Sequence, residues 1–327
     1  MNKNIAVSVI CITYNQKNYI KDALDSFLCQ KVNFEYEILI NDDCSSDGTA
    51  EIVKQYYKKY PNIIKPFFQK ENQYSKGVGP IKDILLPTAK GKYLAICEGD
   101  DYWIDNKKLQ IQYDYMEKHP ECGLCIHNAL LVDKNKEKIG EVRTVKNNAE
   151  ISINDVVING GDFIATSSIF ARMPKDGLLP DYFNILTLDY TWQVFFASNG
   201  NHTFGFCKPM SVYRIGGETS WSTLREKDFE AYKIREINLL LKKNKMRKAF
   251  NEYNHSRFTT IVNEANIYDE IKCNVCIKNY KGLRKKEARL YLKKLGLKEK
   301  TKYRLLMYAP FLYSIYKTLK LHIKKIR

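Results

Sequence analysis

Three carboxyl side chains, Glu98, Asp100 and Asp101, fall within four residues of a 327-residue chain. Carboxylates this close repel one another unless a cation or hydrogen-bond donors lie between them. A hard divalent cation suits such a group, and Mg²⁺ or Mn²⁺ is usually held by one or two carboxylates together with substrate phosphates. A solvated acidic turn is the alternative. The spacing favours a site for a metal ion and phosphates.

A second acidic turn contains Asp42 and Asp43 and leads through Asp47 into a helix pattern. A carboxylate at the carboxyl end of a strand can accept hydrogen bonds from a base or a ribose, and we assign this role to Asp42. Asp47 is better explained as a helix cap. No GxGxxG motif follows the first strand, which argues against an ordinary NAD site.

The elements that position these acids alternate between strand and helix patterns over the first 130 residues. Apolar runs predict strands at 7–12, 36–40, 63–68 and 93–97, and helical spacing predicts helices at 19–30, 49–60 and 109–118. Both acidic turns follow a predicted strand. The alternation predicts an α/β fold, a Rossmann-like layered sheet that is mostly parallel, with its ligands at the carboxyl ends of the strands.

The middle of the chain is less regular. We predict strands at 124–132 and 164–170, a helix at 189–198, and a loop at 215–222. From there to its end the sequence is Lys-rich and helical in pattern. We therefore expect a catalytic-type domain over residues 1–224 and a helical, strongly basic region over residues 225–327.

The net charge of +16 is concentrated near the C-terminus. Residues 281–327 hold 16 Lys and Arg against two Glu, so the rest of the chain is nearly neutral. This distribution argues against a nucleic-acid-binding body, although salt-dependent binding of DNA or RNA by the basic tail remains an alternative. The apolar stretch 305–316 is too short to cross a bilayer, and we expect no transmembrane segment.

Three segments together resemble the family 2 glycosyltransferases that have the GT-A fold. They are 7–15 (VSVICITYN), 41–49 (NDDCSSDGT) and 91–103 (GKYLAICEGDDYW). The similarity covers about residues 5–222, and three motifs in this order are far more specific than one acidic pair. It implies a GT-A domain and transfer of a sugar from a nucleotide donor, with UDP as the expected nucleotide and inversion at the anomeric carbon.

The resemblance also implies roles for individual residues. The positions that match contacts to the base, ribose and diphosphate are Thr13, Tyr14, Asn15, Asp42 and Asp100. Asp101 matches the metal-binding aspartate of the DxD motif, so Mn²⁺ or Mg²⁺ is the implied cofactor. Glu98 stands where many members have the first Asp of that motif, which makes it a possible metal or donor contact.

Asp189 resembles the general base of inverting members, although its bare sequence context would suggest a helix cap. Arg214 lies in a Tyr-Arg pair that resembles the family's Tyr-Arg-x-His loop, and we expect it to neutralise phosphate charge. Gly216 occupies the position of the His, so another ligand or water has to replace that side chain. A sugar-nucleotide binder without turnover is therefore a further alternative. A nucleotidyltransferase is disfavoured because no Gly-rich loop follows the first strand.

The acceptor is expected to be a glycan or a lipid-linked glycan used to build a surface polysaccharide or lipooligosaccharide. The side chains that we place on the acceptor side are Trp103, Thr166, Ser167 and Trp221. The basic, aromatic C-terminal region suits an interfacial helix on an anionic membrane. A helix packed on the catalytic domain is the alternative. We expect a cytoplasmic protein bound peripherally to the cytoplasmic face of the membrane.

Overall fold

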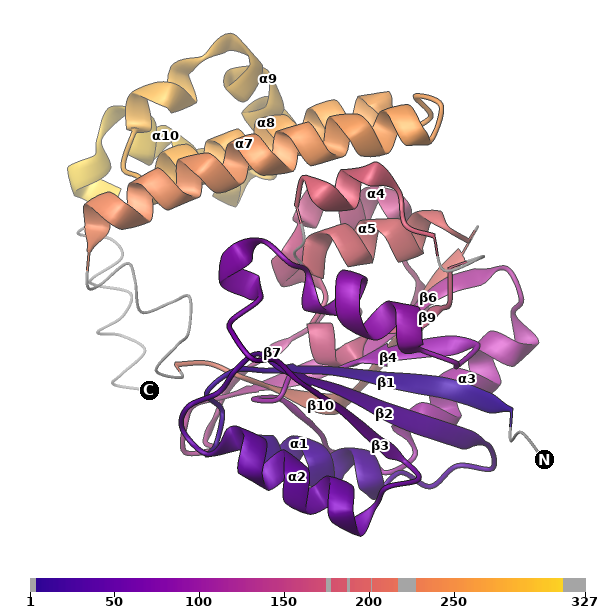
Figure 1. The fold of residues 1–327 in the computed structure, drawn as a ribbon. Coiled ribbons are helices and arrows are strands. Elements are labelled where there is room, and N and C mark those ends of the chain that lie inside the picture. Colours follow the sequence, from indigo (N-terminus) through magenta and orange to yellow (C-terminus); the bar gives the residue numbers. More distant parts are fainter. Residues whose placement is uncertain (1–3, 175–177, 187–188, 201, 217–227, 314–327) are drawn as a thin grey trace. The chain divides into compact units, whose positions relative to one another are not determined.

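The computed structural model describes residues 4–174, 178–186, 189–200, 202–216 and 228–313 (Figure 1). The chain divides into two compact units, Met1–Ser222 and Thr223–Arg327. The assignment of the first as a catalytic domain and of the second as a membrane-associating region stays a prediction.

One sheet of ten strands runs through the described part of the first unit. The strands are β1 (Ile5–Thr13), β2 (Glu35–Asp42), β3 (Ile64–Phe68), β4 (Tyr93–Ile96), β5 (Tyr102–Trp103), β6 (Cys122–Val132), β7 (Lys138–Val142), β8 (Ala149–Glu150), β9 (Phe170–Arg172) and β10 (His202–Arg214). Their order is β3-β2-β1-β4-β9-β6-β10-β5, with β7 beside β6 and β8 beside β10.

The four strands β3, β2, β1 and β4 are parallel. Helix α1 (Ile20–Leu28) connects β1 to β2, and α2 (Thr49–Lys59) connects β2 to β3. These strands and helices confirm the predicted α/β alternation. Beyond β4 the sheet is mixed, because β9 is antiparallel to both of its neighbours whereas β6 and β10 are parallel to each other.

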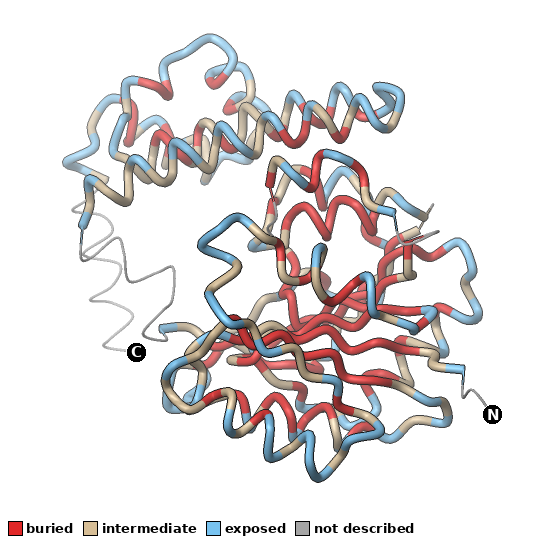
Figure 2. The backbone as a smooth tube through the Cα atoms, in the orientation of Figure 1, coloured by how far each residue is buried: buried red, intermediate tan, exposed pale blue. Residues whose placement is uncertain are grey.

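Helices cover both faces of this sheet (Figure 1). Helices α1 and α2 lie on one face, and α4 (Ile153–Asn159) and α5 (Asp189–Ser198) lie on the other. Helix α3 (Lys108–Lys118) precedes β6. Buried residues concentrate in the central strands (Figure 2), as expected where apolar runs are covered on both sides. The predicted helices at 109–118 and 189–198 are confirmed.

The predicted strand at 164–170 is wrong. Residues Thr166–Ser168 form a 3-10 turn, and only the short β9 follows it. Ser168 donates both its hydroxyl and its N–H to the Ala165 carbonyl, at 2.7 and 2.9 Å. Such local hydrogen bonds compete with pairing between strands, and they explain why the apolar run turns here.

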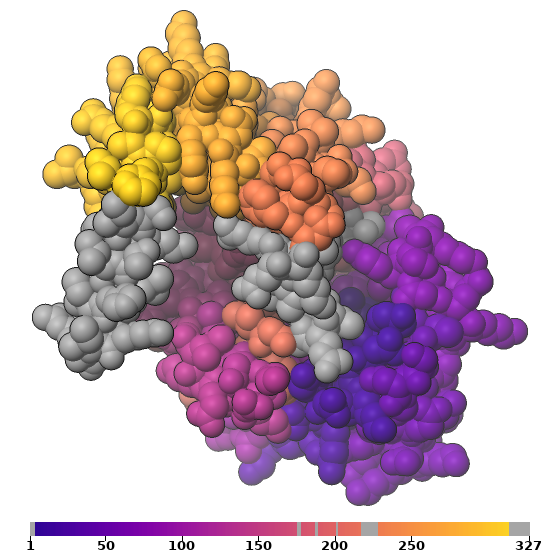
Figure 3. Space-filling model, turned by 90° about the vertical axis from the view of Figure 1, so that its left-hand side faces the viewer, coloured from indigo at the N-terminus to yellow at the C-terminus, as the bar shows by residue number. Residues whose placement is uncertain are grey.

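The second unit contains four α-helices in its described residues. They are α7 (Phe229–Tyr253), α8 (Thr259–Cys276), α9 (Lys286–Lys294) and α10 (Leu297–Tyr308). A small core joins α8, α9 and α10, with Ile271, Leu292 and Leu306 among its buried members. The side chains of these orange and yellow helices project from the surface of the unit (Figure 3). These helices confirm the expected helical character of the C-terminal region. No helix in the described parts of the chain has both the length and the apolar character that crossing a bilayer requires.

Candidate active site

The carboxyl ends of β1 and β2 bring Thr13 and Asp42 side by side, because these residues are partners in the parallel register. Asp42 is buried, and its Oδ1 accepts a hydrogen bond from the Ser45 N–H at 3.1 Å. Asp42 Oδ2 and the Thr13 hydroxyl are also buried and have no hydrogen-bond partner among the described residues. Burial raises the pKa of Asp42. Two neighbouring strands thus offer, at their carboxyl ends, polar atoms that no described residue engages.

The loops that follow β1 and β2 are joined by Asn15. Its N–H donates to the Ser45 hydroxyl and its side-chain oxygen accepts from the Ser46 N–H, both at 2.9 Å. Asn15 has a φ of 52°, a left-handed conformation that Asn tolerates better than most residues. Tyr14, beside it, is 42% exposed. Asn15 therefore holds the loop, and Tyr14 presents an aromatic ring next to Thr13.

The acidic turn 98–101 follows β4 and packs against the loop after β1. A Cβ atom at Gly99 would lie 2.5 Å from Gln16 Oε1 and 2.9 Å from Thr13 Cβ, so this close approach requires glycine. Asp101 is fully buried, and its Oδ1 accepts from the Arg214 N–H at 3.0 Å. Its Oδ2 has no hydrogen-bond partner among the described residues.

Burial raises the pKa of each acid in this turn, and acidic neighbours add to the rise at Glu98 and Asp101. Burial and the charge of Asp100 raise the pKa of Asp101 well above its ordinary value, although the nearby Ser167 and Arg214 act in the opposite direction. Burial also raises the pKa of Asp100 and, with the charge of Asp189, that of Glu98. A bound cation would relieve this repulsion.

These residues fit a divalent metal ion. The Oδ2 of Asp101 is a buried, hard oxygen that no described residue engages in a hydrogen bond, which is the kind of ligand that Mg²⁺ and Mn²⁺ prefer. The described residues contain no group of three or more His, Cys, Asp or Glu side chains arranged to hold a metal ion by themselves. The site would therefore depend on phosphate oxygens from a ligand to complete the coordination.

Asp189, the first residue of α5, lines a pocket together with Glu98 and Thr166. The Thr166 hydroxyl donates to Asp189 Oδ2 at 2.8 Å. Burial raises the pKa of Asp189, and the hydrogen bond from Thr166 opposes that shift. The structure thus brings together Glu98, Thr166 and Asp189. In the sequence Glu98 lies 68 positions from Thr166 and 91 positions from Asp189, so no local pattern reveals that they are close.

The structure buries two of the residues that we place on the acceptor side, Trp103 and Ser167. Trp103 is only 3% exposed, packs on Phe27 at 4.7 Å between ring centroids and donates its Nε1–H to the Ser167 carbonyl. Ser167 is fully buried, and its hydroxyl bonds to that of Ser211. Trp103 lies in β5, which pairs with β10, and the Ser211 that bonds to Ser167 is its partner in that register. Thr166 does line the pocket, and Trp221 lies outside the described residues.

Arg214 does not point its guanidinium into open space for a phosphate. Its Nη2 donates to Asp22 Oδ2 at 3.0 Å and its Nε donates to the Asp100 carbonyl at 2.9 Å. The side chain is only 2% exposed. The expected contact to a diphosphate is therefore replaced by contacts within the protein. Gly216, two residues further on, has a φ of 84° and open space around it.

Sequence reasoning missed two residues that line the pocket, Lys82 and Tyr74. Lys82 belongs to the π-helical turn Pro80–Leu85, and its Nζ donates to Asn184 Oδ1 at 2.6 Å. Tyr74 follows a loop that Asp43 holds, because the two Asp43 oxygens accept from the N–H groups of Gln73 and Tyr74. The sequence gives a partial signal for the Tyr74 loop, because Asp43, which holds that loop, is the second acid of a pair at the end of a predicted strand.

Comparison with known proteins adds relatives and structural neighbours. The model of the family described as Glycosyl transferase family 2 matches residues 8–172. Uncharacterized proteins of Mycobacterium bovis and Mycobacterium tuberculosis are 34% identical over 216 residues, which cover 66% of this chain and 60% of theirs. A poly(ribitol-phosphate) beta-glucosyltransferase of Bacillus spizizenii is 32% identical over 114 residues, 35% of this chain and 17% of that protein.

Two solved structures share the fold. TarS 1–349 of S. aureus in complex with UDP has a TM-score of 0.55 at 16% identity, covering 94% of this chain and 92% of that one. The mannosyltransferase PcManGT from Pyrobaculum calidifontis, in complex with GDP-Man and Mn²⁺, has a TM-score of 0.51 at 15% identity, covering 98% and 88%. Both confirm the GT-A-like α/β fold of this chain.

Proposed function

Since this chain belongs to glycosyl transferase family 2, and is accordingly a glycosyltransferase, we propose that it transfers a sugar from a nucleoside diphosphate donor, a UDP-sugar, with inversion at the anomeric carbon. The proposed acceptor is a hydroxyl of a glycan or lipid-linked glycan in surface polysaccharide or lipooligosaccharide synthesis. The observation that carries the proposal lies in the acidic turn 98–101. Asp101 offers an Oδ2 that has no hydrogen-bond partner among the described residues, and Glu98 of the same turn lines a pocket with Asp189.

The nucleotide would lie at the ends of β1 and β2. The buried Thr13 hydroxyl and Asp42 Oδ2 are available to bond to the base or ribose, because neither has a partner among the described residues. Leaving such atoms unpaired costs about 1–3 kcal/mol each, which a bound ligand recovers. Tyr14 and Asn15 border this position, and Asp100 would contact the ribose and diphosphate.

Asp101, with Glu98 as a possible further contact, would hold Mn²⁺ or Mg²⁺ together with the diphosphate. When bound, the ion supplies Lewis-acid stabilisation of the charge that develops on the departing diphosphate. The chain's own part is to engage one oxygen of Asp101 with the Arg214 N–H, which leaves the second oxygen for the ligand. PcManGT binds GDP-Man and Mn²⁺ on the same fold, which is consistent with this arrangement.

Asp189 would act as general base. Its carboxylate takes the proton of the acceptor hydroxyl as that oxygen attacks the anomeric carbon, and the C–O bond to the diphosphate breaks on the opposite face. This single displacement inverts the anomeric centre. The pKa of Asp189, raised by burial, makes it a stronger base than an exposed aspartate. The Thr166 hydroxyl fixes the orientation of the carboxylate.

The test is a thermal-shift and hydrolysis panel of UDP-, GDP- and dTDP-sugars, with and without Mn²⁺, on wild type and Asp101→Ala. We expect one nucleotide to stabilise the wild type only with metal, by the amount that mass action gives from its affinity. Asp101→Ala should lose this effect, whereas Asp114→Ala, an exposed acid of α3, should keep it.

Two other outcomes of this panel have distinct meanings. Stabilisation by a nucleotide without any turnover would identify a sugar-nucleotide binder that lacks catalysis. If no nucleotide binds under any metal condition, the transferase proposal is wrong, and the basic tail would next be assayed for salt-dependent binding of DNA or RNA.

We further propose that the C-terminal region attaches the enzyme to the cytoplasmic face of an anionic membrane. Residues 281–327 carry 16 basic and two acidic side chains, and Tyr308, Phe311 and Leu312 are exposed beside them. Aromatic and aliphatic side chains among cations suit the interface between headgroups and acyl chains. Nucleotide donors from the cytoplasm and lipid-linked acceptors in the membrane would meet there.

Sedimentation with vesicles tests this attachment. The full chain should bind vesicles that contain phosphatidylglycerol and not vesicles of phosphatidylcholine alone. Phe311→Ser combined with Leu312→Ser should weaken binding, and the exposed Ile139→Ser on β7 serves as a matched control in the other unit. Equal binding to both vesicle types would contradict the electrostatic part of the proposal.

A further inference from the structure

An ion pair joins two residues that are 192 positions apart, Arg214 at the end of β10 and Asp22 in α1. Arg214 Nη2 donates to Asp22 Oδ2 at 3.0 Å. The guanidinium also lies over the rings of Tyr19 and Tyr102, at 4.5 and 5.5 Å from their centroids. One carboxylate and two aromatic faces thus orient a cation that is almost completely buried.

The same arginine holds the acidic turn at two atoms. Its backbone N–H donates to Asp101 Oδ1 at 3.0 Å, and its Nε donates to the Asp100 carbonyl at 2.9 Å. The first bond leaves Oδ2 as the oxygen of Asp101 that has no partner among the described residues. The position of Arg214 therefore decides which oxygen of Asp101 is available to a ligand.

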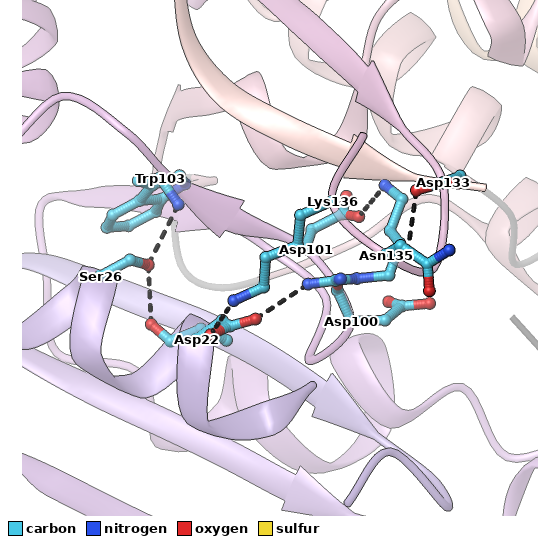
Figure 4. Close-up of polar contacts among 10 residues, drawn as sticks. Asp22, Ser26, Asp100, Asp101, Trp103, Asp133, Asn135 and Lys136 are labelled. Carbon is cyan, nitrogen blue, oxygen red and sulfur yellow. Dashed lines mark hydrogen bonds and ion pairs between the residues drawn. The ribbon is translucent and has the colours of Figure 1, made fainter. Parts of the chain in front are cut away.

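Asp22 also receives a second cation from the turn between β6 and β7. Lys136 Nζ donates to Asp22 Oδ1 at 2.9 Å, and its side chain is half exposed. Figure 4 shows Asp22, Lys136, Asp100 and Asp101 gathered in one region of the unit, with the side chain of Lys136 reaching toward Asp22. Among the described residues Lys136 has no hydrogen bond to the acidic turn. It contacts Asp22 as Arg214 does, but only Arg214 of the two also holds the turn.

We propose that Asp22 is a positioning residue for the metal-binding Asp101 and acts through Arg214. This inference rests on the proposed function. Asp22 draws the guanidinium toward α1 and so keeps it off the carboxylates of Asp100 and Asp101, which are the next acids within its reach. Without Asp22, the guanidinium would pair with the acidic turn and compete there with the metal ion.

The test measures Mn²⁺ binding to the full chain in the presence of UDP, from the loss of the free Mn²⁺ signal in electron paramagnetic resonance. This readout does not depend on turnover. Asp22→Ala and Asp22→Asn should weaken Mn²⁺ binding by about 10- to 100-fold, the range found when groups that orient a metal ligand are removed. Asp22→Glu should restore part of the affinity, and Lys136→Met should change it less than twofold.

A double variant separates competition from general loosening. If the freed guanidinium competes with Mn²⁺, adding Arg214→Met to Asp22→Ala should recover part of the lost affinity. A purely structural role for Asp22 predicts a further loss instead. Circular dichroism and thermal unfolding establish that each variant is folded, and if Asp22→Ala does not fold, the near-isosteric Asp22→Asn decides.

Several results would overturn the inference. If folded Asp22 variants bind Mn²⁺ with UDP as tightly as wild type does, Asp22 has no positioning role, while the proposed function stands. If Lys136→Met weakens binding as much as Asp22→Ala, Asp22 acts through its contact with Lys136 and not through Arg214. If the wild type binds no Mn²⁺ with any nucleotide, the proposed function fails and this inference fails with it.

Discussion

Asp101 in the sheet unit and Asp269 in the helical unit are both buried aspartates in very different surroundings. Asp269 accepts from Arg247 Nη2 at 2.7 Å and lies 3.6 Å from Lys243 Nζ. Burial alone would raise the pKa of Asp269, but these cations outweigh it and lower the pKa. Burial and the charge of Asp100 raise the pKa of Asp101 instead.

The difference teaches how each unit uses a buried charge. A buried ion pair roughly offsets its own desolvation, whereas a buried charge without a partner costs stability. The sheet unit gathers three acids whose pKa values are raised, Glu98, Asp101 and Asp189, without a cationic side chain paired to their carboxylates among the described residues, and Glu98 and Asp189 line one pocket. Acids held at a cost in stability are expected where a ligand supplies the missing partner. In the helical unit the Asp269 carboxylate instead stabilises the fold through its ion pair with Arg247.

The largest effect is expected when a pocket acid loses its charge. Asp189→Asn should slow sugar transfer by about 10²–10⁴-fold, because an amide cannot accept the proton of the acceptor hydroxyl. Donor binding should persist, and the thermal stability of the first unit should not fall, since a buried charge facing Glu98 is removed. Turnover, nucleotide binding and thermal unfolding measure the three outcomes.

Asp114→Asn, on the exposed side of α3, is the control for this substitution and should leave all three quantities unchanged. A folded Asp189→Asn enzyme with wild-type turnover would show that Asp189 is not the base. A variant that is much less stable would show that Asp189 serves the fold, as Asp269 does, and the comparison between the two units would lose its basis.

A second effect is expected in the helical unit. Asp269→Ala should lower its free energy of unfolding by about 3–5 kcal/mol, because the fully buried Arg247 is left without that carboxylate. Urea denaturation followed by circular dichroism measures the change. The double substitution Arg247→Met with Asp269→Leu should lose much less, since both charges are removed together. A single variant that loses less than about 1 kcal/mol would contradict the assignment.

The two units should also respond oppositely to pH. The pKa of Asp269 is lowered, so its contribution is present above the ordinary aspartate pKa of 3.8 and is lost as pH falls through the folded value. The pocket acids have raised pKa values, so the folded first unit holds extra protons between the ordinary and the raised pKa. Its free energy of unfolding therefore falls as pH rises through that window.

Two probes separate these pH responses. All three tryptophans, Trp103, Trp192 and Trp221, belong to the first unit, so their fluorescence reports its unfolding. Circular dichroism at 222 nm gives more weight to the helical unit. Asp269→Asn should remove the loss of stability in acid from the second signal alone. Identical pH dependence of both signals in the wild type would contradict the contrast.

The parts of this site that the sequence predicts are those with local signals. Runs of apolar residues predict β1, β2 and β4, because parallel strands covered on both faces have no polar side. The two acidic turns can be located as well, because each directly follows one of these apolar runs in the sequence. Asp189 was identified through a family resemblance, and its helix through local pattern, since α5 begins where predicted.

The parts that the sequence does not predict depend on distant contacts. The pairing of Arg214 with Asp22 spans 192 positions, and no periodicity reveals it. Trp103 looks like a binding-site aromatic next to the acidic turn, yet it is buried because β5 pairs with β10. The turn Pro80–Leu85, which carries Lys82 to the pocket, has π-helical hydrogen bonds that lack a sequence signature.

The smallest effect is expected at Thr166. Its hydroxyl stabilises the Asp189 carboxylate by a hydrogen bond, as Arg247 stabilises the Asp269 carboxylate, but more weakly. Its hydrogen bond to Asp189 Oδ2 lowers the pKa of that carboxyl. Thr166→Val keeps the shape and removes the bond, so the pKa of Asp189 should rise further. The acidic limb of the pH–rate profile then moves to higher pH, with a loss of about 1 kcal/mol, or roughly fivefold in rate, on that limb.

The matched control is Ser168→Ala in the same 3-10 turn, because the Ser168 hydroxyl bonds to the Ala165 carbonyl and not to Asp189. It should leave the acidic limb where it is, even if it lowers stability. A Thr166→Val profile that coincides with wild type would mean that the hydroxyl only packs against the pocket. A shift to lower pH would mean that the Thr166 hydroxyl favours the protonated form of Asp189, and that Asp189 lacks a partner for its charged form such as Arg247 is for Asp269.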